Sequence, residues 1–212
     1  MFAAFGVATA LLVTGSVVGA DRTDTATCES QEPLDLRLAI LRLKGLRAYD
    51  EGRFAEAVDW YRLAADQGDA GGQWLLGNMY EEGKGIPQSY IDAVRWYRRA
   101  AVQGYAVGQS KLGSMYEDGR GVPQDYTEAV IWYRLAADQG EVRGQWSLGR
   151  MFEQGRGVPQ NYVEAYKWFA LSAAQTKVAG VTMDRDKLLN RMTPAQIAEG
   201  QRIAAAWRPI KK

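Results

Sequence analysis

The chain has 212 residues, a formal net charge of +1, no histidine, one cysteine and 23 glycines. Without histidine it cannot build a Ser-His-Asp triad, a Cys-His pair or a histidine metal site. Its 47% apolar and 24% charged residues suit an ordinary folded protein, while 26 basic against 25 acidic side chains give no bulk charge for nonspecific binding to nucleic acid.

The chain begins with an apolar run, residues 1–20, that contains no charged side chain. Val18-Gly19-Ala20 places small residues where signal peptidase needs them, so we expect a signal peptide cleaved after Ala20 and a periplasmic or secreted product. No lysine or arginine precedes the run, which leaves a membrane anchor formed by residues 1–20 as the alternative.

Residues 21–32 are a polar linker that contains the single cysteine, Cys28. One cysteine excludes an internal disulfide and a cysteine-only zinc site. Thr25-Ala26-Thr27 stands where a lipoprotein would carry a leucine-type residue, so Cys28 reads as a spare thiol. Residues 33–53 follow as a leucine-rich segment with interspersed basic residues, and we expect an N-terminal capping helix there.

A repeat with a period of 36 residues dominates the rest of the chain. Trp60, Trp96, Trp132 and Trp168 keep this spacing, as do Pro87, Pro123 and Pro159. Each unit predicts a helix with the pattern EAVxWYRxAAxQ, a tight turn at a glycine, a second helix with the pattern xLGxMY, and a loop with the pattern GxGxPQ. No segment alternates apolar and polar residues as a strand would.

Polar residues before the first helix of each unit indicate capped helix starts. The expected caps are Ser89, Asp125 and Asn161, and an acidic residue three places on predicts a capping box in each repeat: Asp92, Glu128 and Glu164. The second helices carry paired internal glycines: Gly72 and Gly77, Gly108 and Gly113, Gly144 and Gly149. Because such glycines destabilise a helix, we expect them to permit close approach of bulky aromatic side chains.

The combined pattern, EAxxWYRxAAxQG followed by xLGxMYxxGxGVPQ, resembles the Sel-one-like repeat (SLR), which is similar to the tetratricopeptide repeat. The resemblance covers residues 54–176, with Gly72, Gly108 and Gly144 where the family usually has alanine. It implies an all-α, right-handed α/α solenoid superhelix of about four 36-residue helix-turn-helix repeats. It also implies a non-enzymatic adaptor or scaffold role, in bacteria often in the periplasm or outside the cell.

The ends of a repeat array need capping, because a terminal unit must present a polar face to water. After the solenoid at residues 54–176, residues 177–212 read as C-terminal capping helices and a tail. We expect the two helices over residues 184–192 and 195–207.

The positions at which the four copies differ indicate where a partner binds. They form one stripe of the EAVxWYR helix, opposite its Trp/Ala face, and the resemblance places this helix on the concave surface. Flanking arginines recur in three copies. The expected partner-binding residues are Asp59, Arg62, Arg95, Arg98, Arg99, Ile131, Arg134 and Lys167.

Two interpretations of the recurring arginines remain open. They can grip carboxylates of a partner, or they can pair along their own helix, as Arg62 with Asp66 and Arg134 with Asp138, for about 0.3 kcal/mol each. Arg98 is the exception, because Val102 offers it no local partner. The sharpest site hypothesis is therefore a basic spot in the second repeat.

The chain is thus expected to bind an acidic protein or peptide, with no cofactor, no metal and no nucleic acid. Membrane association is expected only if residues 1–20 are retained. The tryptophans at the 36-residue spacing are expected to pack in the core. An alternative function is glycan binding through exposed Trp74, Trp146 and Tyr105, and a more remote one is a hydrolase that uses carboxylates alone.

Overall fold

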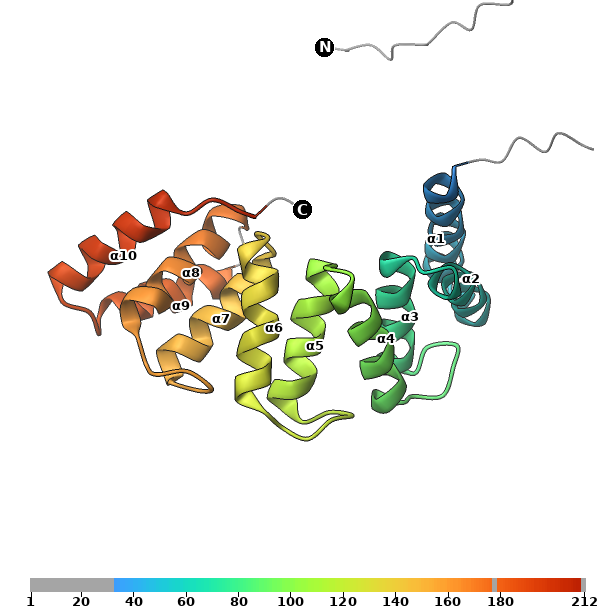
Figure 1. Cartoon of the computed structure of the whole chain (residues 1–212), viewed down its shortest axis with the longest axis horizontal. Coiled ribbons are helices and arrows are strands. Elements are labelled where there is room, and N and C mark those ends of the chain that lie inside the picture. Colours follow the sequence, from blue (N-terminus) through green and yellow to red (C-terminus); the bar gives the residue numbers. More distant parts are fainter. Residues whose placement is uncertain (1–32, 177–178, 211–212) are drawn as a thin grey trace, which may run out of the picture. The chain divides into compact units, whose positions relative to one another are not determined.

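The computed structural model describes residues 33–176 and 179–210, and this part of the chain contains ten α-helices and no strand (Figure 1). The expected signal peptide, the linker and Cys28 lie outside the described residues. The helices are α1 (Leu34–Asp50), α2 (Phe54–Asp66), α3 (Ala70–Glu82), α4 (Tyr90–Val102), α5 (Ala106–Asp118), α6 (Tyr126–Asp138), α7 (Val142–Gln154), α8 (Tyr162–Gln175), α9 (Ala179–Leu189) and α10 (Pro194–Ala206).

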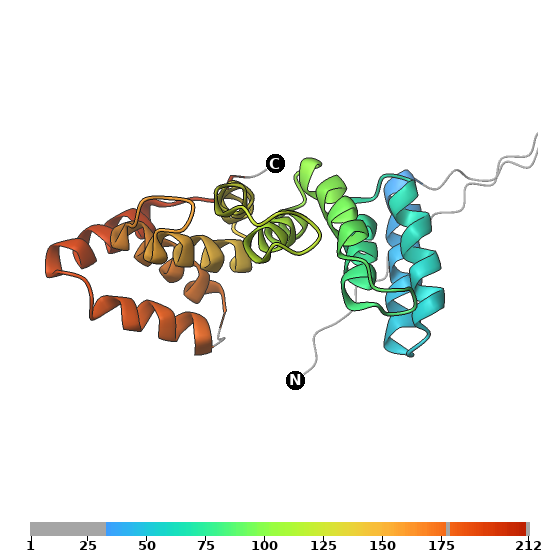
Figure 2. The same cartoon turned by 90° about the horizontal axis from the view of Figure 1, so that it is seen from below.

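The helices pack in antiparallel pairs that follow one another along the chain, which confirms the predicted α/α solenoid (Figures 1 and 2). They form two rows. The first row consists of α1, α3, α5 and α7, and the second row consists of α2, α4, α6 and α8. The tryptophan repeat of the sequence lies on the second row, and the paired glycines lie on the first.

The two rows differ in how closely their helices approach from one repeat to the next. First-row helices contact the next first-row helix, as α3 contacts α5 and α5 contacts α7, whereas the described backbones of successive second-row helices lie farther apart. Close approach of this kind belongs to the inner side of a curved repeat array. The expectation that the EAVxWYR helices line the concave surface is therefore wrong, because those helices form the second row.

Close contacts explain the paired glycines of the first row. A Cβ on Gly77 would lie 2.6 Å from the Tyr97 ring, and Gly113 and Gly149 meet Tyr133 and Phe169 in the same way. Aromatic packing is thus confirmed for this member of each pair. The other member, such as Gly72, packs instead on an alanine methyl and the backbone of the preceding helix.

The predicted caps of the second-row helices form only in part. Side-chain oxygens of Ser89, Asp125 and Asn161 accept hydrogen bonds from the N–H groups that open α4, α6 and α8. The reciprocal half of a capping box would need the backbone N–H of the cap residue, but this group donates to the preceding first-row helix, for example from Asp125 to the Tyr116 carbonyl. Instead, the complete box is found at α10, between Thr193 and Gln196.

The N-terminal helix α1 packs in the position of a first-row helix, but its outer face is polar, as expected for a capping helix. Gly45 meets the Tyr61 ring just as Gly77 meets that of Tyr97, so the two helices can be superposed residue by residue. In this register Lys44 and Arg47, both exposed, stand where α3 has buried Leu76 and Met79. Charged side chains therefore cover the end of the array.

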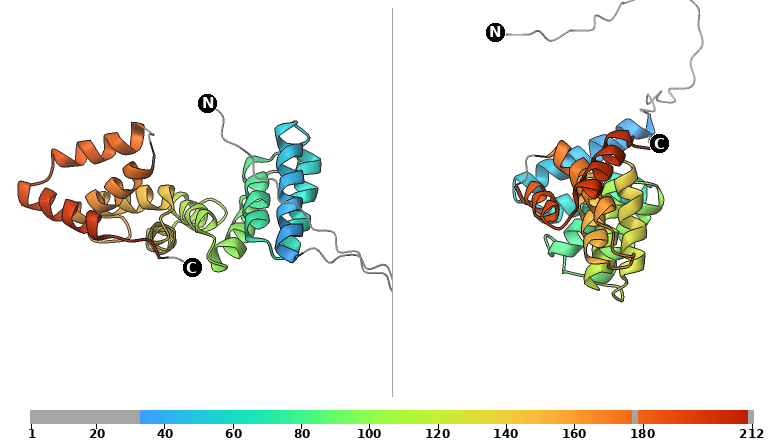
Figure 3. Two further views of the ribbon diagram at one scale, coloured as in Figure 1. Left: turned by 90° about the horizontal axis from the view of Figure 1, so that it is seen from above. Right: turned by 90° about the vertical axis from the view of Figure 1, so that its left-hand side faces the viewer.

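At the other end, α9 and α10 both pack against α8 (Figure 3). Both helices are predicted from the sequence, but the first is expected to begin at residue 184, whereas α9 begins at Ala179. This segment lies beyond the repeat, so no periodic signal marks its start. In the described ranges, no helix combines the length and the apolar character needed to cross a bilayer.

Candidate partner-binding groove

The basic spot expected in the second repeat lies in a shallow groove along α4. The groove has a volume of about 460 Å³ and is formed by α4 and by the loop that leads into α6. Its lining residues are Ile91, Val94, Arg95, Arg98, Arg99, Val102, Gly121 and Val122. Three of the residues predicted for partner binding, Arg95, Arg98 and Arg99, thus share one surface.

The three arginines make different intramolecular contacts. Arg95 pairs with Asp92 on its own helix at 3.2 Å. Arg98 donates a hydrogen bond to the Tyr116 hydroxyl at 2.7 Å, and the Arg99 guanidinium lies 4.5 Å from the centre of the Trp96 ring. Among the described residues, neither Arg98 nor Arg99 forms an ion pair with a carboxylate. Two positive charges are therefore exposed and open to a partner's carboxylate.

Apolar side chains at both ends of the arginine cluster were not predicted as site residues from the sequence. Ile91 and Val102 are 66% and 68% exposed. At the position of Val102 two other repeats carry aspartate, Asp66 and Asp138, so an unusual residue in the repeat alignment could have indicated it. The groove combines apolar surface with positive charge.

The other predicted site residues do not join this groove. Asp59 and Arg62 lie on α2, Ile131 and Arg134 on α6, and Lys167 on α8. The alternative ion pairs of Arg62 with Asp66 and of Arg134 with Asp138 are absent from the described part of the chain. Arg134 instead lies 5.4 Å from the Phe152 ring centre, and Lys167 pairs with Glu164 at 3.4 Å. A continuous arginine ladder is therefore not formed.

The tryptophans of the second row pack against the core, as predicted, but to different degrees. Trp60, Trp96 and Trp132 are partly buried, whereas Trp168 is only 1% exposed. Trp207, beyond α10, covers Trp168 with the ring centres 6.2 Å apart and the planes at 73°. The fourth tryptophan is therefore buried by the C-terminal tail.

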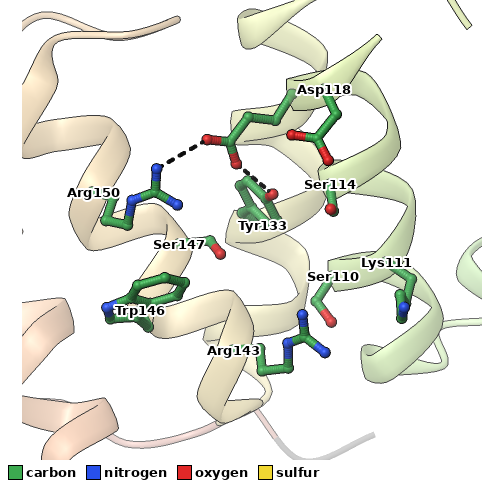
Figure 4. Close-up of a pocket in the computed structure, with 10 residues that line it drawn as sticks. Ser110, Lys111, Ser114, Asp118, Tyr133, Arg143, Trp146, Ser147 and Arg150 are labelled. Atoms are coloured by element: carbon green, nitrogen blue, oxygen red, sulfur yellow. Dashed lines mark hydrogen bonds and ion pairs between the residues drawn. The ribbon is translucent and has the colours of Figure 1, made fainter. Parts of the chain in front are cut away.

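A second, more polar pocket of about 240 Å³ lies between α5 and α7 of the first row (Figure 4). Its lining residues are Ser110, Lys111, Ser114, Glu117, Asp118, Tyr133, Arg143, Trp146, Ser147 and Arg150. Most of its charges are already paired: Lys111 with Glu81 at 2.8 Å and Arg150 with Glu117 at 3.5 Å. These pairs join one repeat to the next.

The carboxylates of these ion pairs also accept hydrogen bonds from buried tyrosine hydroxyls. Tyr97 donates to Glu81 at 2.6 Å and Tyr133 donates to Glu117 at 2.7 Å. Burial by itself would raise the pKa of Glu81, but the hydrogen bonds from Lys111 and Tyr97 outweigh it, so the pKa lies below its ordinary value. Burial and the adjacent carboxylate raise the pKa of each tyrosine. These hydroxyls therefore stay protonated and hold the carboxylates that pair with the next first-row helix.

Of the aromatic residues of the glycan alternative, Trp146 is held by intramolecular contacts. The Trp146 indole N–H donates to Asp184 at 2.8 Å, and the Arg150 guanidinium lies 4.9 Å from its ring centre. Trp74 and Tyr105 lie beside each other, with ring centres 6.1 Å apart, and line a groove with α1. A sugar would have to displace Arg150 to stack on that face of Trp146.

Four consecutive matches to the sequence model of the Sel1 repeat cover residues 36–69, 70–105, 106–141 and 142–177. The chain belongs to the Sel1 repeat family. In this register each Sel1 repeat begins with a first-row helix and ends with a second-row helix, so α1 opens the first repeat. Sel1 repeat proteins act in general as non-catalytic scaffolds for protein–protein interaction.

Two solved structures share the fold. A protective antigen present in uropathogenic Escherichia coli strains, which displays an SLR fold, is 38% identical with a TM-score of 0.64, over 68% of this chain and 33% of that one. A Sel1 repeat protein from Oxalobacter formigenes is 35% identical with a TM-score of 0.60, over 71% and 62% of the two chains.

Two curated relatives match shorter stretches, and both are named exopolysaccharide production negative regulator. The protein of Rhizobium leguminosarum bv. viciae is 48% identical over 44 residues, which is 21% of this chain and 16% of the relative. The protein of Rhizobium meliloti (strain 1021) is 44% identical over 48 residues, or 23% and 18%. The match thus spans less than a fifth of either relative.

Proposed function

We propose that this Sel1 repeat protein is a non-enzymatic scaffold that binds an acidic protein or peptide in the α4 groove. The observation that carries the proposal is the exposed cluster of Arg95, Arg98 and Arg99 beside apolar Ile91 and Val102. Guanidinium groups pair in bidentate fashion with carboxylates, and apolar surface contributes affinity that charge alone does not. Such a groove selects a segment in which acidic and apolar residues are mixed.

A regulatory adaptor role is consistent with the two short matches to negative regulators of exopolysaccharide production. We propose that the chain likewise acts by holding a partner rather than by chemistry. No group of three or more metal-binding side chains occurs in the described ranges, and the carboxylates Glu81 and Glu117 are committed to ion pairs between repeats. Their pairing supports a structural role for them.

The test is an array of immobilised twelve-residue peptides of graded net charge, probed with the purified chain. Peptides that mix acidic and apolar residues should retain it best. Charge reversal of all three groove residues (Arg95→Glu, Arg98→Glu and Arg99→Glu) should reduce retention at least tenfold. The matched control reverses three basic residues outside the groove (Arg37→Glu, Lys187→Glu and Arg202→Glu) and should leave the pattern unchanged.

Equal loss in the two triple variants would refute a specific groove, because the overall charge alone would then decide binding. A parallel array of cell-wall glycans tests the alternative function. Retention on glycans that depends on Trp74 and Trp146, and ignores the groove arginines, would favour glycan binding over our proposal.

We also propose that the scaffold works outside the cytoplasm, after cleavage near Ala20. The apolar and uncharged character of residues 1–20 supports this proposal. Cell fractionation with N-terminal sequencing of the recovered protein tests it. A periplasmic or secreted chain that begins at Asp21 is expected, and an uncleaved chain in the cytoplasmic fraction would contradict it.

A further inference from the structure

The C-terminal tail of the chain is itself an extended segment bound to the second row. After α10 the backbone is extended at Trp207, and the tail runs toward the end of α6 (Figure 1). The Ile210 N–H donates a hydrogen bond of 2.8 Å to the carbonyl of Asp138, the last residue of α6. A Cβ on Gly140 would lie 3.7 Å from both Pro209 and Trp207, so the tail passes over this glycine, and Trp207 covers Trp168.

The residues that the tail contacts have equivalents one repeat earlier, and no segment of the described chain covers those equivalents. Thirty-six residues upstream, Val102 takes the place of Asp138, Gly104 that of Gly140, and Trp132 that of Trp168. Gly104 has the same left-handed backbone, with φ of 87° against 88° for Gly140. Val102 ends α4, where helix carbonyls lack partners within the helix. It also lines the α4 groove.

The uncovered position differs from the covered one mainly in charge. At the positions of Arg95, Arg99 and Val102 in α4, the helix that meets the tail, α6, carries Ile131, Leu135 and Asp138. The change from an aspartate to valine, with two added arginines, makes the α4 surface more positive by three charges. The tail carries Arg208 between Trp207 and Pro209, so like charge would disfavour a segment of this sequence on the α4 surface.

We infer that the α4 groove binds an extended acidic segment in the manner of the tail: an aromatic side chain lies over Trp132 and a backbone N–H three residues later donates to the Val102 carbonyl. Acidic residues take the place of Arg208 and meet Arg98 and Arg99. This inference rests on the proposed function and adds to it the conformation of the partner and its one required aromatic residue.

The first experiment titrates the full chain with two synthetic peptides and measures the dissociation constants by calorimetry. One peptide, Asp-Glu-Trp-Glu-Pro-Ile-Asp-Glu, copies the tail with acidic residues in place of its arginine, and the other has alanine in place of tryptophan. The tryptophan peptide should bind at least tenfold more tightly. N-methylation of the isoleucine amide, which removes the donor to Val102, should weaken it by a similar factor.

The second experiment converts the α4 groove into the surface that receives the tail, with the exposed substitutions Arg95→Ile, Arg99→Leu and Val102→Asp together. The acidic tryptophan peptide should then lose at least tenfold in affinity. A peptide with the sequence of residues 206–210, Ala-Trp-Arg-Pro-Ile, should bind the variant at least tenfold more tightly than it binds the wild-type chain.

The outcomes separate this inference from the proposed function. If the tryptophan, alanine and N-methyl peptides bind equally well, the tail-like mode is wrong but acidic recognition stands. If none of the acidic peptides binds, the proposed function fails with it. If the triple substitution leaves the preference for the acidic peptide unchanged, the groove is not where the segment lies and the inference is overturned.

Discussion

The tyrosines that recur on the second row differ in whether their buried hydroxyl groups have a hydrogen-bond partner. Tyr97 and Tyr133 donate to carboxylates, but the buried Tyr61 hydroxyl has no hydrogen-bond partner in the described part of the chain, and Phe169 occupies the equivalent place in the last repeat. Burial, with a smaller effect of Asp50, raises the pKa of Tyr61 to about 12. The first repeat thus holds a buried donor that the last repeat lacks.

Removing this hydroxyl with Tyr61→Phe should leave the free energy of unfolding unchanged or raise it by up to about 1 kcal/mol, since an unpaired buried polar group is costly. The same change at Tyr97 should lower it by about 2 kcal/mol, because Glu81 loses a donor. Urea unfolding of both variants measures the difference. A larger loss at Tyr61 than at Tyr97 would show that its hydroxyl is satisfied in solution.

The ion pair at Glu81 makes part of the stability depend on pH. Its side chain is 13% exposed and its pKa is lowered in the folded state, so its contribution is present above the ordinary value of about 4.3 and is lost as the pH falls through the folded value. Glu81→Gln should cost about 2 kcal/mol at pH 7. The gap to the wild-type chain should narrow below about pH 4.

The control for this experiment is Glu82→Gln, because Glu82 is 45% exposed and its pairing with Lys84 is screened by solvent. Its unfolding free energy should follow that of the wild-type chain at every pH. A gap between Glu81→Gln and wild type that stays constant from pH 7 to pH 3 would refute the linkage.

The close packing between first-row and second-row helices determines which helical glycines can be replaced by alanine. Gly77→Ala would place a Cβ 2.6 Å from the Tyr97 ring and should lower the free energy of unfolding by about 1–3 kcal/mol. Gly180→Ala, on α9, meets nothing within 4 Å and should leave it unchanged or raise it by up to about 1 kcal/mol. Thermal unfolding compares the two, and equal effects would argue against the aromatic contact.

The end of the array at α1 should remain free of partners because of two charged residues. Lys44→Leu with Arg47→Met gives α1 the buried residues of α3 and should create a self-associating surface. Sedimentation velocity should show a larger species than wild type. The control, Lys44→Gln with Arg47→Gln, removes the charge but not the polarity and should sediment as wild type. Identical behaviour of both variants would contradict the capping role.

Much of the helical plan can be predicted from the sequence, because the period of 36 residues repeats the same turn and cap chemistry. The four second-row helices begin and end within a residue or two of the pattern. The sequence does not show as clearly that α1 is a first-row helix, because the loop before α2 lacks the GxGxPQ pattern. The spacing also differs: Gly45 precedes Tyr61 by 16 residues, whereas Gly77 precedes Tyr97 by 20.

The candidate site was predictable only in its local part. Arg95, Arg98 and Arg99 are four or fewer residues apart, so one helix brings them together. The return of the tail to α6, by contrast, joins Ile210 to Asp138, and no local pattern encodes a contact across 72 residues. The face of the array that carries the groove was misplaced for the same reason, because it depends on how rows pack.

At the scale of the whole molecule, the chain is a Sel1 repeat array with two different surfaces. The first row carries the ion pairs of Lys111 with Glu81 and of Arg150 with Glu117, which join one repeat to the next, and the second row carries unpaired arginines and partly buried tryptophans. Paired charges hold the repeats together, whereas exposed unpaired charges are available to a partner. We therefore expect a partner to bind on the second row.

Photo-crosslinking locates the bound segment on the chain. The acidic peptide described above, with benzoylphenylalanine in place of its tryptophan, is irradiated with the full chain and the attached residues are identified by mass spectrometry. Crosslinks are expected within residues 91–102, at Val122 or at Trp132. Crosslinks confined to the pocket between α5 and α7, at residues such as Arg143 or Trp146, would contradict it.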